Sequence, residues 1–143
     1  MSVEHILAGK GRDVVTVGPD HTLAEAAETL SQRRIGAAVV VDGGGAVLGI
    51  ISERDVVKAV AAGGGSALAD PVSSRMTTKV VTCGPSCSID EIMGLMTDGK
   101  FRHVPVVEGG RLGGIISIGD VVKHRLAQVE EEQRAMRDYI ATA

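Results

Sequence analysis

Aromatic side chains are nearly absent from this sequence, which holds one Phe, one Tyr and no Trp in 143 residues. Many proteins bind single-stranded nucleic acids by stacking the bases on aromatic rings, and others bind organic cations in cages of aromatic rings. With so few aromatic residues, we expect neither kind of site. An excess of basic charge is also lacking, because 15 Lys and Arg residues stand against 18 Asp and Glu, for a formal net charge of −3. We therefore expect no nucleic-acid partner, although a small phosphate bound by a local group of cations fits this composition.

Long apolar runs and cysteines are equally scarce. No stretch approaches the roughly 20 apolar residues that a membrane-spanning helix needs, and the first residues, MSVEHILAGKGRD, lack the basic and then apolar pattern of a signal peptide. Cys83 and Cys87 are too few for a disulfide framework and have no companion ligands at metal-binding spacing. We expect a cytoplasmic protein with reduced thiols, no metal and no membrane partner, with a regulatory Cys83–Cys87 disulfide as the alternative for this pair.

The chain does contain an internal repeat. The segment VVTVGPDHTLAEAAETL at 14–30 recurs as VVTCGPSCSIDEIMGLM at 80–96, and VVDGGGAVLGIISERDVVK at 40–58 recurs as VVEGGRLGGIISIGDVVK at 106–123. The repeat cores cover about 14–62 and 80–127, with a Gly/Ala/Ser-rich linker between them. We therefore predict a first domain over 1–66, a second over 67–130, and a C-terminal helical tail over 131–143.

Each copy has the pattern of a strand, a helix, two strands and a final helix. Thr22 with Glu25, and Ser88 with Glu91, are placed to form capping boxes at the first helix of each copy. The final helices start near Ser52 and Ser117. One such unit would be marginal alone, so we expect an α/β (α+β) fold in which the two units pack sheet to sheet around a pseudo-twofold axis. The predicted core of the first helices consists of Leu23, Ala26, Ala27, Leu30, Ile89, Ile92, Met93 and Met96.

A doubled motif, G-I-I-S-x-x-D, ends at Asp55 in the first copy and at Asp120 in the second. A strand ends there, a serine opens a helix, and a carboxylate follows three residues later. Helix N-termini favour phosphate, Ser52 and Arg54 could add donors, and Asp55 could accept from both hydroxyls of a ribose. Such a set suits a nucleotide. The alternative is ordinary helix capping with dipole compensation, and the spacing alone leaves both interpretations open.

Basic residues precede the second strand of each copy, as Arg33-Arg34-Ile35-Gly36-Ala37 in the first and Lys100-Phe101-Arg102-His103-Val104-Pro105 in the second. Facing a helix N-terminus, these side chains would form a cationic cleft in an otherwise acidic protein. A solvated run of charges is the alternative for some of them. Arg102 and His103 are the best candidates to point inward, because they are attached to the apolar strand itself.

With these motifs the chain resembles a pair of CBS domains (the cystathionine β-synthase motif), often called a Bateman module, over about residues 3–127. The resemblance rests on the doubled G-I-I-S-x-x-D, the strand R-H-V-P-V-V and the segment R-M-T-x-K-V-V-T, and it is nearest to small stand-alone bacterial members. It implies a regulatory module without a catalytic cofactor, which binds AMP, ADP, ATP, NAD or S-adenosylmethionine, senses energy or redox state, and modulates a partner protein. It also implies a disc-like homodimer.

The resemblance further implies roles for individual residues. Asp55 and Asp120 would hold ribose, Ser52 and Ser117 would reach phosphate, and the base would lie against the first two strands of either copy. The second copy has Ile118-Gly119 where the first has Glu53-Arg54, so the two clefts should differ in affinity or ligand. The implied ligand contacts are Thr16, Val17, Arg34, Ile35, Gly36, Ala37, Ser52, Arg54, Asp55, Thr82, Cys83, Phe101, Arg102, His103, Val104, Pro105, Ser117 and Asp120.

Two other functions stay open at this stage. An interaction scaffold with vestigial clefts would act through dimerisation and the tail helix, whose apolar residues Leu126, Val129, Met136 and Ile140 share one stripe interrupted by Gln133. That stripe would pack on its own module, on a second subunit or on a client protein. An enzyme related to inosine monophosphate dehydrogenase would need a catalytic barrel of roughly 250 residues, which this sequence lacks.

Overall fold

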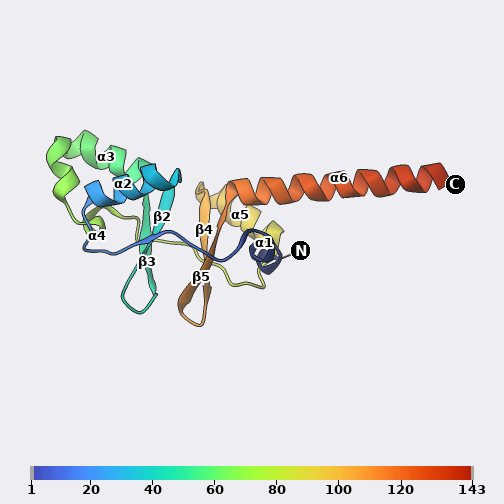
Figure 1. Cartoon of the computed structure of the whole chain (residues 1–143), viewed down its shortest axis with the longest axis horizontal. Helices are drawn as coiled ribbons and strands as arrows, with labels where there is room; N and C mark the ends of the chain where they lie inside the picture. Colours follow the sequence, from blue (N-terminus) through green and yellow to red (C-terminus); the bar gives the residue numbers. More distant parts are fainter. Residues whose placement is uncertain (1, 143) are drawn as a thin grey trace.

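The computed structural model describes residues 2–142. It consists of two similar units of strands and helices, and the second unit ends in one long helix (Figure 1). The mixed α/β class and the predicted order of elements in the first unit are confirmed. The first unit comprises β1 (Thr16–Val17), α2 (Leu23–Arg33), β2 (Ala37–Val41), β3 (Val47–Ser52) and α3 (Glu53–Gly63). The second comprises α5 (Ile89–Gly99), β4 (His103–Glu108), β5 (Arg111–Ser117) and α6 (Ile118–Thr142), while α1 (Val3–Lys10) precedes the units and the 3₁₀ helix η1 (Gly64–Ala69) and α4 (Val72–Arg75) connect them.

The second unit lacks a full counterpart of strand β1. In the first unit β1 pairs in parallel with β2, and the Val39 N–H donates to the Val15 carbonyl at 3.2 Å. The position equivalent to Val39 is Pro105, which has no N–H to give. The pairing there shrinks to an isolated parallel bridge between Cys83 and Val106. The predicted first strand of the second copy is therefore reduced to one bridged residue.

Hydrogen bonds from side chains fix where the first helix of each unit begins. The Glu25 N–H donates to the Thr22 hydroxyl oxygen at 3.2 Å, and the Glu91 N–H donates to the Ser88 hydroxyl oxygen at 3.1 Å. Both predicted N-caps are confirmed. Neither predicted capping box is complete: in α2 the Glu25 carboxylate accepts from the Thr22 hydroxyl and not from its backbone N–H, and in α5 the structure of residues 2–142 shows no return bond to Glu91.

The predicted core positions of α2 and α5 are buried with two exceptions. Ala27 is half-buried, and Met93 is 36% exposed. Met93 lies beside α6, where the Arg125 guanidinium contacts its sulfur at 3.7 Å, so it packs under a charged side chain and not in the apolar core. The confirmed core positions are Leu23, Ala26, Leu30, Ile89, Ile92 and Met96.

Each unit is completed by the segment that precedes the other unit. Helix α1, at the start of the chain, packs into the second core, and the Val3 N–H donates to the Cys87 carbonyl at 2.8 Å. Helix α4, before the second unit, packs into the first core, and the Val72 N–H donates to the His21 carbonyl at 2.7 Å. His21 and Cys87 are equivalent positions of the repeat. The two units are therefore bound together by an exchange of their leading segments.

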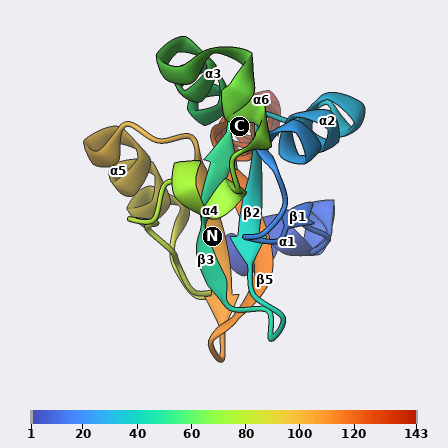
Figure 2. The same ribbon diagram turned by 90° about the vertical axis from the view of Figure 1, so that its left-hand side faces the viewer.

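The two sheets bury the faces that do not carry helices. Val39 in β2 is fully buried but lies outside the first core, whereas its neighbours Ala38 and Val40 lie within it. Alternation along a strand therefore turns Val39 to the other face of the sheet. Pro105 in β4 is fully buried and likewise outside the second core. A view along the molecule shows the helices arranged around the strands (Figure 2), and the sheet-to-sheet packing is as predicted.

Two glycines allow the exchanged segments to approach the strands. A Cβ at Gly49 in β3 would lie 2.7 Å from the Thr77 carbonyl oxygen and 2.9 Å from the Met76 sulfur. A Cβ at Gly114, the equivalent position in β5, would lie 2.7 Å from the side chain of Leu7. Thr77 pairs with Ile50 through two backbone hydrogen bonds of 2.9 and 3.0 Å. Gly49 therefore permits the backbone of the linker to run against β3.

We expect Gly49→Ala to lower the free energy of unfolding by about 1–3 kcal/mol, because the methyl group would overlap a backbone oxygen held by two hydrogen bonds. Gly113→Ala is the matched control, since a Cβ there would meet its nearest neighbour, the Val106 carbonyl oxygen, at an ordinary 3.8 Å. We expect the control to change the unfolding free energy by less than about 0.5 kcal/mol. Denaturant unfolding measures both, and equal effects would contradict the close approach.

Candidate functional site

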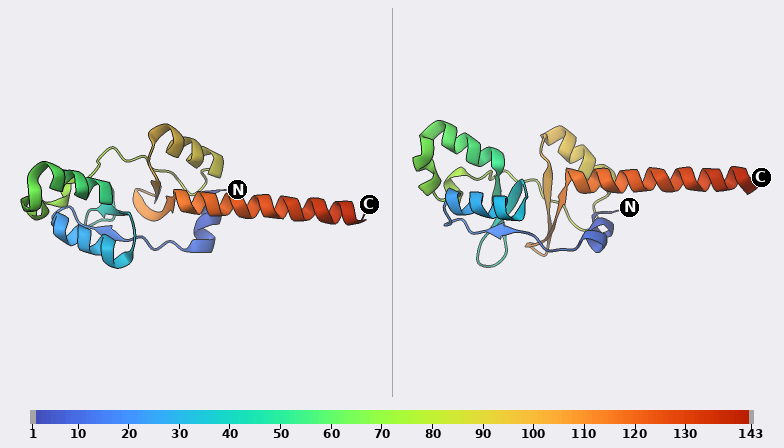
Figure 3. Two further views of the ribbon diagram at one scale, coloured as in Figure 1. Left: turned by 90° about the horizontal axis from the view of Figure 1, so that it is seen from above. Right: turned by 45° about the horizontal axis from the view of Figure 1, so that its top comes forward.

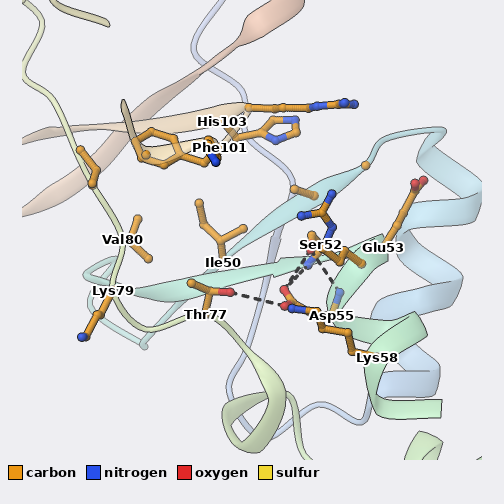
Figure 4. Close-up of a pocket in the computed structure, with 17 residues that line it drawn as sticks. Ile50, Ser52, Glu53, Asp55, Lys58, Thr77, Lys79, Val80, Phe101 and His103 are labelled. Atoms are coloured by element: carbon orange, nitrogen blue, oxygen red, sulfur yellow. Dashed lines mark hydrogen bonds between the residues drawn. The ribbon is translucent and has the colours of Figure 1, made fainter. Parts of the chain in front are cut away.

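A cavity of about 560 Å³ lies between the two units, and we call it the inter-unit cavity (Figure 4). Its volume is within the range of small-molecule sites. One wall is the end of β3 with the start of α3, a second is the linker after α4, and the third is the entrance to β4. The lining residues are Gly36, Ala37, Ile50, Ser52, Glu53, Arg54, Asp55, Lys58, Thr77, Lys79, Val80, Val81, Gly99, Lys100, Phe101, Arg102 and His103.

The start of α3 is a complete capping box. The Ser52 hydroxyl oxygen accepts from the Asp55 N–H at 3.3 Å, and Asp55 Oδ2 accepts from the Ser52 N–H at 2.9 Å. The capping interpretation of this motif is confirmed. It does not use the whole carboxylate, because Asp55 Oδ1 has a single, long contact of 3.4 Å from the Thr77 hydroxyl within residues 2–142. Asp55 can therefore cap the helix with one oxygen and accept from a ligand with the other.

The backbone donors of α3 are largely used by the protein. The Glu53 N–H donates to the Gly36 carbonyl at 3.0 Å and the Asp55 N–H to Ser52, so the Arg54 N–H is the one of the first three without a bond in the described part of the chain. A helix N-terminus attracts an anion mainly through such free donors. The binding of an anion here would therefore depend more on side chains than on the backbone N–H groups of the helix N-terminus, which the sequence predicted as the phosphate site.

Five cationic side chains supply that charge: Arg54, Lys58, Lys79, Lys100 and Arg102. Two carboxylates, from Glu53 and Asp55, share the lining. None of the ion pairs found among residues 2–142 involves any of the five cations. A chain of net charge −3 thus gathers an uncompensated positive group at one cavity, and the predicted cationic cleft is present there.

The cations come from both units. Arg54 and Lys58 are one helical turn apart on α3, whereas Lys100 and Arg102 stand at the entrance to β4 across the cavity. In the close-up, Phe101 and His103 lie on the opposite side of the cavity from Ser52 and Asp55. A ligand in this place would touch the first unit with one part and the second unit with another.

His103 is a neutral member of this group. Burial lowers the pKa of its imidazole, and the nearby positive charge of Lys10 lowers it further, against a smaller opposing effect of Asp120. A neutral imidazole can donate one hydrogen bond to a phosphate but adds no charge. His103 lines the inter-unit cavity, and the Asp120 carboxylate of the second motif also acts on its pKa.

The second motif has the same cap but a different partner. The Ser117 N–H donates to Asp120 Oδ2 at 2.8 Å, and the Asp120 N–H donates to the Ser117 hydroxyl oxygen at 3.1 Å. Lys10 Nζ then donates to the same Oδ2 at 2.6 Å and to the Ile115 carbonyl at 2.9 Å. The carboxylate equivalent to Asp55 is therefore already bound to a cation from α1. That the two clefts differ in affinity or ligand remains a prediction.

Lys10 was not among the predicted site residues. Val3 and Val72 donate to equivalent carbonyls, so the two leading segments correspond through these residues and Lys10 corresponds to Lys79, which lines the inter-unit cavity. Burial alone would raise the pKa of the Asp120 carboxyl, but the hydrogen bonds from Lys10 and from the Ser117 backbone outweigh it, and the pKa lies below its ordinary value. Comparing the segments that lead into the two copies would have selected both lysines.

Several predicted contacts do not line the inter-unit cavity. Val17, Cys83, Val104 and Pro105 are buried; burial and the neighbouring Cys87 raise the pKa of the Cys83 thiol to about 12. Their contact with a ligand remains a prediction, as does that of the others. The predicted residues outside the lining are Thr16, Val17, Arg34, Ile35, Thr82, Cys83, Val104, Pro105, Ser117 and Asp120.

Other lining residues escaped the sequence interpretation, above all those of the linker. Thr77 and Lys79 precede the second repeat core, so periodicity gave no reason to select them, and Val80 and Val81 open that core but were not selected. Lys58 could have been found, because it follows Arg54 by four residues and so shares its face of the helix. Within residues 2–142 we find no cluster of three His, Cys, Asp or Glu residues that could hold a metal ion, and no helix suited to cross a membrane.

Comparison with known proteins agrees with this architecture. The family model for the CBS domain matches the chain twice, at residues 4–62 and 72–127. A CBS-domain containing protein of Agrobacterium tumefaciens superimposes with a TM-score of 0.84 at 58% sequence identity, covering 87% of this chain and 99% of that one. A Pyrobaculum aerophilum CBS domain protein solved with AMP gives a TM-score of 0.75 at 27% identity, covering 84% and 89% of the two chains.

A CBS domain pair solved with 5'-methylthioadenosine and S-adenosyl-L-methionine gives a TM-score of 0.79 at 26% identity, covering 90% of this chain and 98% of that one. Enzymes also match in part. The chain is 36% identical over 139 residues to the inosine-5'-monophosphate dehydrogenase of Mycobacterium leprae, but it spans only 25% of the length of that enzyme. It spans 61% of a mitochondrial CBS domain-containing protein of Arabidopsis thaliana.

We expect Lys10→Met to lower the free energy of unfolding by about 0.5–1 kcal/mol at pH 7, because the variant loses a partly buried ion pair. The depressed pKa of Asp120 makes this contribution fully present above its ordinary value of 3.8 and lost as the pH falls through the lower native value. Urea unfolding at pH 7 and below pH 3 measures the difference. Lys58→Met is the control, and an equal loss in the two variants at pH 7 would contradict the account.

Proposed function

The chain belongs to the CBS-domain family, and on that premise we propose that it is a regulatory module which binds a phosphorylated adenosine nucleotide in the inter-unit cavity. The observation that carries the proposal is the group of five cations without an ion pair among residues 2–142, in a cavity where Asp55 Oδ1 has only a long contact of 3.4 Å. A mononucleotide has the matching layout, with anionic phosphate at one end and a ribose diol beside it. CBS domain pairs of known structure bind adenosine ligands, AMP among them.

The cavity suggests how such a ligand would lie. Phosphate would sit among Arg54, Lys58 and the cations of the second unit, where charge-assisted hydrogen bonds are strongest. Ribose would donate to Asp55 Oδ1. The apolar part of the lining, to which Ile50 and Phe101 contribute, would take the base. With one phenyl ring and one imidazole among the lining residues, aliphatic walls and backbone amides would hold the base more than stacked aromatics.

The charge of the cavity favours some adenosine ligands over others. Desolvated cations repel a further positive charge, so S-adenosylmethionine, with its sulfonium and ammonium groups, fits the inter-unit cavity poorly. AMP, ADP, ATP and NAD carry phosphates and fit it well. Binding across both units would then shift the chain toward one relative arrangement of the units, which is how a ligand level would reach a partner protein.

The module acts in this proposal without catalysis and without a catalytic cofactor. The same proposal includes homodimerisation and the modulation of a client protein. By passing a nucleotide level on to that client, the chain would act as a sensor of energy or redox state. The alternative, an interaction scaffold with vestigial clefts, is supported by the exposed part of α6 and does not explain why five cations gather at one cavity. The two functions differ in a single property, the binding of a nucleotide.

Isothermal titration calorimetry with AMP, ADP, ATP and NAD tests the proposal. We expect one bound nucleotide per chain and a loss of tenfold or more in affinity in Asp55→Ala, because a hydrogen bond to a charged group contributes about 1.5–3 kcal/mol. Asp120→Ala is the matched control, since it removes a helix-capping carboxylate of the same kind that Lys10 already occupies. We expect its affinity for a nucleotide in the inter-unit cavity to fall by far less than in Asp55→Ala, because the charge that it removes is paired with Lys10.

Circular dichroism checks that both variants remain folded, because either loses a cap worth about 1 kcal/mol. No heat of binding from any of the four nucleotides at millimolar concentration would refute the proposed function. Equal losses in Asp55→Ala and Asp120→Ala would instead show that the carboxylates act on affinity through the helix caps alone.

A further inference from the structure

The last part of α6 projects away from both units (Figures 1 and 3). The helix spans 25 residues, and every described residue from 129 to 142 is exposed. An isolated helical segment of this length is marginal in water. It nevertheless carries large apolar side chains, with Val129 41%, Met136 59% and Ile140 66% exposed. A stable helix with this composition needs a partner along its apolar side.

The apolar side is distinct from the side that holds α6 on its own unit. The helix contacts its unit through Val121, which is buried, and through Arg125, which forms an ion pair with Asp90. At 100° per residue, the apolar stripe is centred about a quarter of a turn away from this contact side. The stripe consists of Val122, Leu126, Val129, Gln133, Met136 and Ile140.

The spacing of the stripe is that of a coiled coil. Its members follow one another at intervals of four, three, four, three and four residues, which is the alternation of the two core positions of a heptad, a and d. In this register Leu126, Gln133 and Ile140 take position a, and Val129 and Met136 take position d. Five of the six stripe residues are apolar, so each supplies one layer of a potential interface.

The polar member of the stripe favours a particular partner and direction. In a parallel, in-register pair, Gln133 lies opposite the partner's Gln133, and the two amides can bond to one another. A polar residue at one core position commonly fixes register in this way. An antiparallel pairing of the exposed segments would place Gln133 against the partner's Met136, which leaves a buried amide without an acceptor.

Charges beside the stripe agree with the parallel arrangement. Glu132 stands at position g and Arg137 at position e, and in a parallel coiled coil the g residue of one helix meets the e residue five positions later in the other. Glu132 would therefore face the partner's Arg137, twice in the dimer by symmetry. Antiparallel pairing of the exposed segments would bring Glu130 to Arg137 and would leave Val122 and Leu126 uncovered.

We propose that α6 is the interaction surface for a second copy of this chain and that the two helices form a parallel, in-register coiled coil from Val122 to Ile140. The surface complements itself in apolar spacing, in its one polar layer and in charge, which singles out the same chain as the occupant. The coiled coil would hold two modules side by side at one end. It rests on the homodimerisation in the proposed function and names its surface, and its tests are separate from those of the nucleotide site because nucleotide binding can succeed or fail whatever α6 binds.

Sedimentation equilibrium of the full chain from nanomolar to micromolar concentration tests the interface. We expect a dimer, and we expect Met136→Glu with Ile140→Glu to raise its dissociation constant at least tenfold, since two core layers would bury like charges. Ala135→Glu with Ala141→Glu is the matched control, because it adds the same charges on the outer face of the helix. A monomeric wild type, or a dimer that is equally stable in both double variants, would overturn the proposal.

Charge reversal tests the direction of the helices. Arg137→Glu should weaken the dimer two- to tenfold, and adding Glu132→Arg should restore it, because the two residues meet across a parallel pair. Adding Glu130→Arg in place of Glu132→Arg should give no recovery. Recovery with Glu130→Arg alone would overturn the parallel arrangement in favour of the antiparallel one. Ligand titration of each variant separates these outcomes from any failure of the nucleotide site.

Discussion

The structure depends on one constraint, which is that neither unit can complete its own core. A unit of this size buries too little surface to be stable by itself. The chain meets this constraint by exchange, with α1 packed into the second unit and α4 into the first. The linker must then run between the units to reach its place, where Thr77 pairs with β3 against Gly49. The inter-unit cavity exists because this crossing brings the linker and the entrance of β4 to the start of α3.

The same exchange makes the two related carboxylates unequal. The segment that crosses toward Asp55 brings the neutral hydroxyl of Thr77 to 3.4 Å from Asp55 Oδ1. The segment that crosses toward Asp120 brings the charged Lys10 Nζ to 2.6 Å from Asp120 Oδ2. The carboxylate of Asp120 is paired with a cation, whereas that of Asp55 has no ion pair among residues 2–142. The charge distribution follows the same division, because the uncompensated cations line the cavity that contains Asp55. The two copies of the motif therefore differ in the charge beside their carboxylates.

The sequence alone predicted the elements well, because local chemistry determines them. The caps at Thr22 and Ser88, the apolar periodicity and the repeat all act within a few residues of the chain, and the doubled Ser-x-x-Asp located the start of α3. Contacts between the units were harder to predict from the sequence. The placement of Lys10 on Asp120 and of the linker at the cavity depends on the crossing of segments that are 110 and 22 residues apart in sequence, and no periodic pattern encodes such a crossing.

The central claim is that the cations of the inter-unit cavity hold the phosphate of an adenosine nucleotide. The most direct test compares the affinities of the wild-type chain for AMP and for adenosine by calorimetry at low ionic strength, since the two ligands differ in the phosphate alone. The account predicts that AMP binds at least tenfold more tightly and that added salt narrows the difference, because ions screen the cations. Equal affinities for the two ligands, unchanged by salt, would contradict it.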